Sequence, residues 1–325
     1  MMKRITWPCL ALAVAVLAAV ADRATAEQMA PAAIDVKPLV AALAASDEAK
    51  AAAAREKLGA AGEGAVAPLI AILTDAAAPA PQRKAAAAGL AAVGRPATGA
   101  VVKLLIHPDA GVRAAAACTL GRIGDPAIVL TLAKALNDRD AAVRLETAKA
   151  LGDLRDVQAC GALATAHTKD ASPEVRAAAA LALGRLRCRA SIEPLIEGLR
   201  DAQPAVRASA AEALGLLAPL LVTGARGELG RLKAVDALIA TLKDADPTVR
   251  LRTVETLGLM KENMAAAPLA GVLGETALRP AAIRSLGQIG SLQARKILEE
   301  VVETSPDEAA RRAAAAAIAE MRKRP

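Results

Sequence analysis

The stretch NDRDAAVRLETAKALGDLRD, residues 137–156, carries the pattern that decides the fold. Val143, Leu151 and Leu154 recur at intervals that place them on one face of an α-helix. Asp140 stands just before this apolar face, where an aspartate caps the free amides of a helix start. The stretch therefore predicts an amphipathic helix over 141–154 that follows a polar turn.

This helix is one copy of a repeat that runs through most of the chain. A Val-Arg pair, followed after six residues by Leu-Gly, begins at Val112, Val143, Val175, Val206 and Val249. Less regular copies contain Arg83, Arg279 and Arg311, and a copy at 51–59 lacks the arginine. Successive arginines from Arg83 are 30, 31, 32, 31, 43, 29 and 32 residues apart. A period near 31 is typical of stacked repeats.

Each period also holds a second apolar stripe upstream of the Val-Arg helix, so that one repeat is a helical hairpin. A hairpin this small buries its apolar face only by packing on its neighbours. We therefore predict an all-α fold in which about nine hairpins form an α-solenoid over residues 27–325. The first helices are expected near 34–45, 64–74, 97–106, 126–137, 157–168, 191–200, 232–243, 264–274 and 292–303. The second helices are expected near 48–60, 81–93, 110–123, 141–154, 173–186, 204–217, 247–260, 279–289 and 307–322.

The 43-residue interval indicates an insertion near 218–231. Gly224, Gly227 and Gly230 predict that it is flexible, and Arg226 and Arg231 make it basic. Two interpretations stay open, a tolerated surface insertion and a binding loop or hinge.

The repeated turn and Val-Arg helix resemble the HEAT repeat, in the short bacterial form named after phycobilisome lyases. The matching residues include Asp138, Asp140, Arg144, Leu151 and Gly152, and the resemblance covers 34 to about 323. It implies a right-handed superhelix whose second helices line a concave groove. It says little about function, because the family includes scaffolds, adaptors, lyases and hydroxylases.

The resemblance also gives the repeated arginine a role. It implies that this residue pairs with turn aspartates of adjacent repeats and forms a structural ladder, rather than binding a ligand. The ladder residues are Arg113, Arg144, Arg176, Arg207 and Arg250.

The opposite stripe of each second helix, at two, five and nine residues after the arginine, should face the groove. These positions give the candidate protein-binding residues, with a bland solvated face as the alternative. They are Arg122, Glu146, Lys149, Asp153, Leu181, Arg185, Glu212, Leu216, Arg252, Glu255 and Leu259. The three leucines would form an exposed apolar strip.

Residues suited to catalysis are few. The two histidines, His107 and His167, should lie at turns about 20 Å apart and do not share a metal. No phosphate-binding loop, nucleophile elbow or zinc-protease motif is present. We therefore expect no catalytic residue, no metal and no cofactor.

Cysteine spacing suggests one structural link. Cys160 starts a first helix and Cys188 follows the second helix of the same hairpin, so antiparallel packing brings the two together. Either a disulfide joins them or they are two small thiols.

The N-terminus has the layout of a secretory signal peptide over residues 1–26. Lys3 and Arg4 precede an apolar run over 10–21, and Ala24-Thr25-Ala26 has the form of a signal-peptidase site. The alternative is an uncleaved membrane anchor, for which the apolar run is short. We expect a periplasmic or secreted protein without a stable membrane span after cleavage.

Composition and charge complete the functional expectation. The chain has no Phe or Tyr and one Trp, Trp7, so base-stacking platforms are missing, and its net charge of +7 is spread among interspersed signs. We expect no nucleic-acid partner and predict an exported, non-catalytic scaffold or adaptor for another protein. The alternatives are a lyase-type enzyme or accessory factor, and binding of an anionic envelope polymer or nucleic acid.

Overall fold

The computed structural model describes residues 34–220 and 225–323, with side chains of 225–227 left aside. The predicted signal peptide at 1–26 lies outside the described residues. The described residues form helices and no strand, which confirms the all-α prediction. Nine helix pairs follow one another within 34–220 and 225–323, and the chain divides into two compact units with a boundary after residue 100.

The first unit contains two hairpins and the start of a third. Its helices are α2 (Lys37–Ala44), α3 (Glu48–Ala61), η1 (Gly62–Ala65), α4 (Val66–Thr74), α5 (Ala80–Val93) and η2 (Arg95–Ala97). Leu58, Leu69 and Leu90 are fully buried where α3, α4 and α5 meet.

The second unit holds the regular repeats. Its first-helix segments are α6 (Thr98–Lys103, which crosses the boundary) with η3 (Leu104–Ile106), η4 (Pro126–Ile128) with α8 (Val129–Lys134) and η5 (Ala135–Asn137), η6 (Val157–Ala159) with α10 (Cys160–Lys169), η7 (Arg189–Ser191) with α12 (Ile192–Gly198), α14 (Ala225–Thr241), η9 (Asn263–Ala265) with α16 (Ala266–Gly271), and α18 (Leu292–Thr304). Its second helices are α7 (Ala110–Ile123), α9 (Ala141–Leu154), α11 (Pro173–Arg185), α13 (Pro204–Leu217), α15 (Pro247–Met260), α17 (Arg279–Ile289) and α19 (Glu308–Arg322), with η8 (Ala218–Leu220) after α13.

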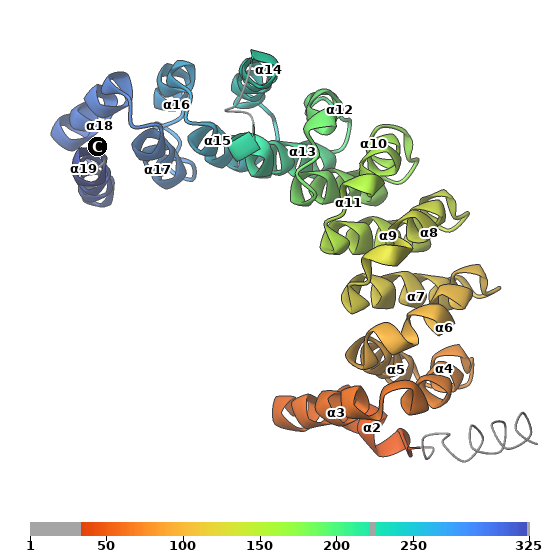
Figure 1. The fold of residues 1–325 in the computed structure, drawn as a ribbon. Helices are drawn as coiled ribbons and strands as arrows, with labels where there is room; N and C mark the ends of the chain where they lie inside the picture. The colour runs from red at the N-terminus through yellow and green to blue at the C-terminus, as the bar shows by residue number, and fades with distance from the viewer. Residues whose placement is uncertain (1–33, 221–224, 324–325) are drawn as a thin grey trace, which may run out of the picture. The chain divides into compact units, whose positions relative to one another are not determined.

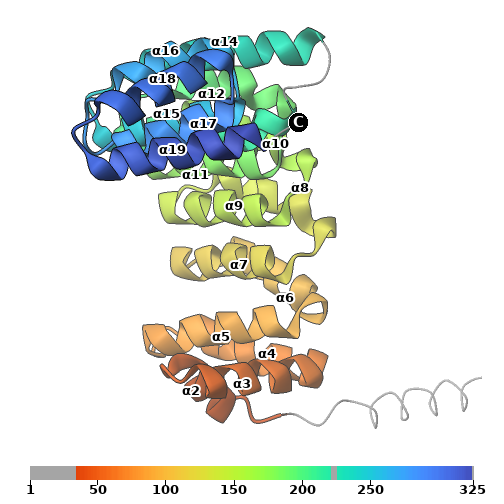
Figure 2. The same cartoon turned by 90° about the vertical axis from the view of Figure 1, so that its left-hand side faces the viewer.

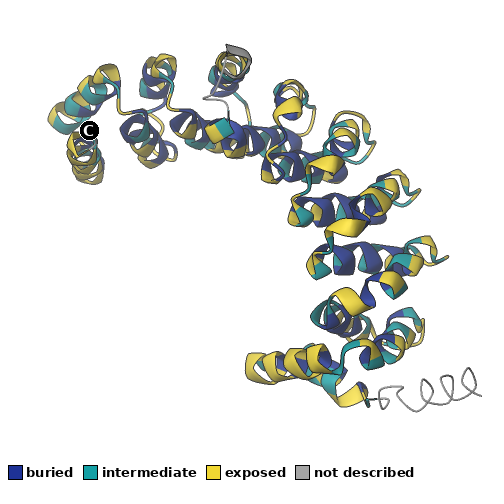
Figure 3. Cartoon of the chain, viewed as in Figure 1, coloured by how far each residue is buried: buried dark blue, intermediate teal, exposed yellow. Residues whose placement is uncertain are grey.

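Within this unit the second helices pack on one another in chain order and form one layer (Figures 1 and 2). The first helices form the other layer, and buried residues lie where helices meet (Figure 3). Leu120, Leu151, Leu183 and Leu214 are each fully buried at equivalent places in successive hairpins. The apolar faces are thus covered by the neighbouring hairpin, as a repeat array requires.

A glycine in each second helix from α7 to α17 permits this close stacking. A β-carbon added at Gly121 would lie 2.6 Å from Ala150 Cβ, and one at Gly184 would lie 2.8 Å from Ala213 Cα. The same position is occupied by Gly152, Gly215, Gly258 and Gly287 in the other repeats that continue the stack. In α19 Ala319 takes the position.

The repeat pattern changes next to the boundary between the two units. Ala91 occupies the glycine position of α5. His107 occupies the position of Asp138, since Nδ1 of His107 accepts the Asp109 amide as Oδ1 of Asp138 accepts the Asp140 amide. Both positions therefore depart from the repeat pattern, one on each side of residue 100.

The expected insertion loop is largely helical, which corrects the predicted start of the seventh first helix. Helix α14 begins at Ala225, seven residues before the expected residue 232. Two features support the longer helix. Ile192 packs close to Gly230, since a β-carbon added there would lie 3.4 Å from Ile192 Cδ1, and Arg231 Nε lies 2.7 Å from Glu262 Oε1. Glycine permits a helix here because neighbouring helices hold it in place.

A disulfide joins Cys160 and Cys188 across the α10–α11 hairpin, with Cα atoms 6.1 Å apart. Cys188 stands where Asp125 and Asp156 cap the equivalent first helices through their side chains. The covalent link thus occurs where the hydrogen-bonded cap is missing.

Replacing both cysteines by serine should lower the free energy of unfolding by about 2–4 kcal/mol, because the bridge closes a 28-residue loop in the unfolded chain. Urea unfolding with and without reductant measures this, and reductant should not affect the double-serine variant. Equal stability of the native protein with and without reductant would contradict the structural role of the bridge.

By length and composition, one helical stretch among the described residues, 48–74, would be able to cross a membrane, or two if a bent helix pair counts as one span. This stretch comprises α3, η1 and α4, and its residues Leu58 and Leu69 are fully buried in the first unit.

Candidate functional site

The ladder arginines stand at the fourth residue of their second helices and reach the turn of the next hairpin. Arg113 donates two bonds to Asp138, at 2.7 and 2.8 Å, and Arg144 donates two to Asp170, at 2.7 and 2.9 Å. The same two-bond pairing joins Arg176 to Asp201 and Arg207 to Asp244.

Each arginine also holds its own turn. Arg113 Nη1 donates to the His107 and Pro108 carbonyls, and Oδ1 of Asp138 accepts the Asp140 amide. The bond from Arg113 is the largest of the effects that hold the pKa of Asp138 below its usual value. With their donors and acceptors used in this way, these groups link hairpins rather than offering a ligand site.

Arg250, the fifth ladder residue, makes a different contact. Arg250 Nη2 lies 3.0 Å from Oε2 of Glu275, whose side chain is 44% exposed, and the two-bond geometry is absent. Arg250 Nε is buried without a hydrogen-bond acceptor among the described residues. The sequence indicates this difference, because the turn at Gly274-Glu275 lacks the aspartate that pairs with the arginine in the other turns.

The predicted binding residues lie on the solvent side of the second-helix layer, which we call the second-helix face. Eight of them are exposed: Arg122, Lys149, Asp153, Arg185, Glu212, Leu216, Arg252 and Leu259. The other three, Glu146, Leu181 and Glu255, are half-buried.

Apart from Arg122 on α7, the charged binding residues on this face pair with one another in the described structure. Lys149 bonds Glu146 at 2.7 Å within α9, and Arg185 bonds Asp153 at 3.1 Å between α11 and α9. Arg252 lies 3.6 Å from Glu212 and 3.0 Å from Glu255. The face therefore offers mutually neutralised charge over four helices.

The apolar strip is narrower than expected from the sequence. Leu216 on α13 and Leu259 on α15 are 41% and 49% exposed, but Leu181 is half-buried. Leu181 lies on α11, which approaches α9 and α13 closely through Gly152 and Gly184, so less of its side chain meets solvent. Two leucines on adjacent helices remain.

Cys118 has no disulfide partner among the described residues and is half-buried on α7. Burial, followed by the negative charge of Glu146, raises the pKa of its thiol. A thiol held in the protonated form is a weak nucleophile.

The two histidines occupy different environments. His107 follows η3 at a turn, as expected, whereas His167 lies inside the last turn of α10 and is 2% exposed. Its Nδ1 lies 3.0 Å from the Arg176 carbonyl, and Nε2 is buried with no hydrogen-bond partner among the described residues. Burial outweighs the nearby carbonyls of Arg176 and Pro194 and lowers the pKa of His167.

This histidine should make the protein less stable in mild acid. Below the unfolded-state pKa of about 6.5 the unfolded chain binds a proton that the folded chain rejects, so the free energy of unfolding falls until the pH reaches the lower folded pKa. His167→Gln should remove this fall between pH 7 and 5, while His107→Gln should retain it. Urea unfolding at several pH values measures both, and an unchanged pH dependence in His167→Gln would contradict the assignment.

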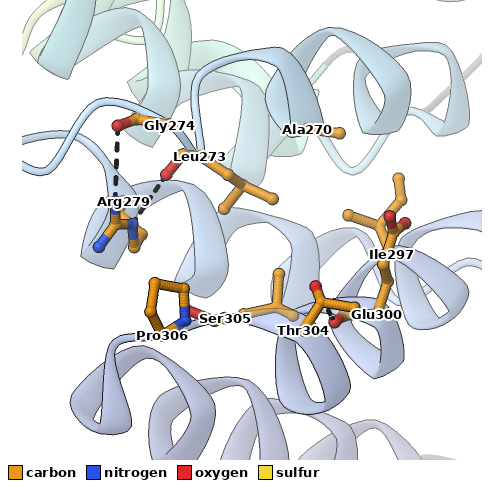
Figure 4. A pocket seen from close by; sticks show the side chains of 10 residues that line it. Ala270, Leu273, Gly274, Arg279, Ile297, Glu300, Thr304, Ser305 and Pro306 are labelled. Atoms are coloured by element: carbon orange, nitrogen blue, oxygen red, sulfur yellow. Dashed lines mark hydrogen bonds between the residues drawn. The ribbon is translucent and has the colours of Figure 1, made fainter.

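Clefts open between the ends of successive first helices, close to the ladder. Their volumes are about 490 Å³ between α8 and α10, 610 Å³ between α14 and α16, and 370 Å³ between α16 and α18. In the last, Arg279 donates to the Leu273 and Gly274 carbonyls at the cleft wall (Figure 4). Arg279 also lies 3.0 Å from Asp307, so it joins two hairpins and is not left for a ligand.

The Arg231–Glu262 pair was missed by sequence reasoning, which placed Arg231 in a basic loop. Its side chain is 21% exposed and ties α14 to the turn before α16. No motif signals this pair, because it depends on where α14 begins.

Comparison with known proteins gives one sequence match and several structural ones. A family profile described as HEAT repeats matches residues 98–169, 162–219 and 235–319. A search of curated proteins finds no match.

Among solved structures, YibA of E. coli is 20% identical, covers 86% of this chain and 98% of its own, and superposes with a TM-score of 0.59. Kap95p, described with RanGDP, is 15% identical over 89% of this chain and 45% of its own, with a TM-score of 0.65. Kap121p is 13% identical over 79% and 33% of the two chains, with a TM-score of 0.60. At these identities the likeness concerns the fold alone.

Proposed function

Because the chain belongs to the HEAT-repeat family, we propose that it is a non-catalytic scaffold whose second-helix face binds another protein. The observation that carries the proposal is the exposed leucine pair, Leu216 and Leu259, on adjacent helices of one layer. Burying the two side chains against a partner would be favourable by about 1.5–3 kcal/mol each at most, since both are already partly covered.

The paired charges around these leucines support a protein partner of mixed character. Glu212, Arg252 and Glu255 form a polar rim beside the leucines, which is the usual anatomy of a protein interface. A similar fold engages a protein in Kap95p, which is described as binding RanGDP. The raised pKa of the Cys118 thiol also favours a scaffold over the lyase alternative.

We also propose that the protein is exported to the periplasm or secreted, on the strength of the signal-peptide layout at 1–26. The mass of the protein recovered from that compartment tests this: loss of residues 1–26 is expected, and an intact Met1–Ala26 segment would contradict cleavage.

Site-specific photocrosslinking in the native compartment tests the scaffold role. A photoreactive residue at position 216 should give a discrete adduct with a protein partner, and Leu259→Asp should abolish that adduct. The matched control is position 292, since Leu292 is also exposed but lies on α18 in the other layer. Identical products from both positions, or none from position 216, would contradict the proposal.

A further inference from the structure

A fourth cleft, apart from the second-helix face, lies between α6–η3 and α8–η5. It has a volume of about 410 Å³, and its apolar lining includes Val102, Leu105, Ile106 and Ala135. Thr131 and Asn137 add a hydroxyl and an amide to its wall. The cleft is thus an apolar recess with groups able to bond a peptide backbone.

Ile106 is the unusual residue of this cleft, because its side chain is 88% exposed. It directly precedes His107, which occupies the aspartate position of the repeat. The residues that precede the equivalent aspartates are polar: Asn137, Lys169, Arg200 and Lys243. An isoleucine at this position gives nothing to the core, and a partner that covered it would gain from the hydrophobic effect.

Two cations flank the recess. Lys103 and Lys134 line it and are exposed, and the described structure gives neither an ion pair. The acid in the cleft, Asp138, is already bonded twice by Arg113. The charge here is therefore uncompensated, unlike the paired charges of the second-helix face.

We propose that this cleft docks an acidic-apolar peptide segment of a partner protein. An apolar side chain of the segment inserts beside Ile106, Val102 and Leu105, and carboxylates on either side bond Lys103 and Lys134. The cleft beside Ile106 favours a partner that inserts a side chain over a flat lipid surface, which would meet the projecting Ile106 and leave the cleft unfilled. The site is separate from the leucine pair on α13 and α15 and does not depend on the function proposed for it.

Fluorescence anisotropy with the full chain tests the site. The probe is a labelled eight-residue peptide of alternating glutamate and leucine, with one matched peptide carrying lysine for glutamate and another carrying serine for leucine. Only the glutamate–leucine peptide should bind. A salt concentration of 0.5 M should weaken its binding, because the charged contacts are exposed.

Variants then place the contact. Ile106→Asn, which installs the residue of the next repeat, and the double change Lys103→Gln with Lys134→Gln should each weaken binding at least tenfold. Lys296→Gln, on α18, and Leu216→Asp with Leu259→Asp should leave it unchanged. Because Ile106 is exposed, the Ile106→Asn variant should have the same thermal unfolding midpoint as the native protein. A loss of peptide binding at an unchanged midpoint would then be due to the binding site and not to a loss of folding.

Three results would overturn the proposal: equal binding of the serine or lysine peptide, native affinity in Ile106→Asn, or binding by anionic phosphatidylglycerol vesicles in place of the peptide. Loss of binding in the Leu216→Asp, Leu259→Asp variant would assign the peptide to the second-helix face instead.

Discussion

Gly121→Ala should destabilise the protein by about 2–3 kcal/mol, although alanine favours a helix over glycine by about 1 kcal/mol. The new β-carbon would meet Ala150 at 2.6 Å from its Cβ and 2.7 Å from its Cα. Since the second contact is with backbone, helices α7 and α9 must separate. Chemical unfolding monitored by circular dichroism measures the loss.

Two further variants make the interpretation specific. Adding Ala150→Gly removes one of the contacting atoms and should restore about 1 kcal/mol, a coupling expected only between residues in contact. Gly161→Ala lies at an open position of α10, where a β-carbon meets nothing within 4 Å, and should be neutral or slightly stabilising. A destabilised Gly161→Ala, or a harmless Gly121→Ala, would show that close helix approach is not what stabilises the stack.

Arg113→Ala should cost about 3 kcal/mol, near the value for breaking a buried pair, since the Arg113 and Asp138 side chains are only 6% and 12% exposed. Removing the guanidinium takes the donor from the His107 and Pro108 carbonyls and leaves the Asp138 carboxylate with the Asp140 amide as its remaining donor. Asp138→Asn should cost less alone and add little to Arg113→Ala, which a double-mutant cycle measures.

The pH dependence of the free energy of unfolding tests the Arg113–Asp138 pair independently. Because Asp138 has a lowered pKa in the folded chain, its stabilisation is present above the unfolded value near 3.9 and is lost as the pH falls through the folded value. Arg113→Ala should reduce that acid-side loss. The control is Arg312→Ala, which breaks an exposed pair with Glu308 and should change stability by less than about 0.5 kcal/mol. Equal effects of the two substitutions would contradict a structural ladder.

The sequence was sufficient for the hairpins, because each second helix begins with a capping or proline residue and most of them end near Leu-Gly. Helices α7, α9, α13 and α15 have the predicted bounds, residue for residue. The apolar period and the caps are local signals, so these elements could be read without tertiary information.

Features that depend on contacts between hairpins were harder to predict. The start of α14 was wrong because Gly230 and Arg231 suggest a loop until Ile192 and Glu262 are placed beside them. Leu181 was expected to be exposed because the pattern fixes its direction but not the spacing of the neighbouring helices. The cleft at Ile106 was not predicted, because it forms between two first helices. The repeat pattern of the second helices predicts only binding residues on the second-helix face.

The central claim is that each hairpin is stabilised by the next one along, and hydrogen exchange on a shortened chain tests it most directly. Deleting residues 290–325 removes α18 and α19, the neighbours of α17. The structure predicts that amides of α15 and α17 lose protection while those of α7, α9 and α11 keep it. Uniform loss of protection from α7 to α17 would show a single cooperative core and would contradict an array of neighbouring hairpins.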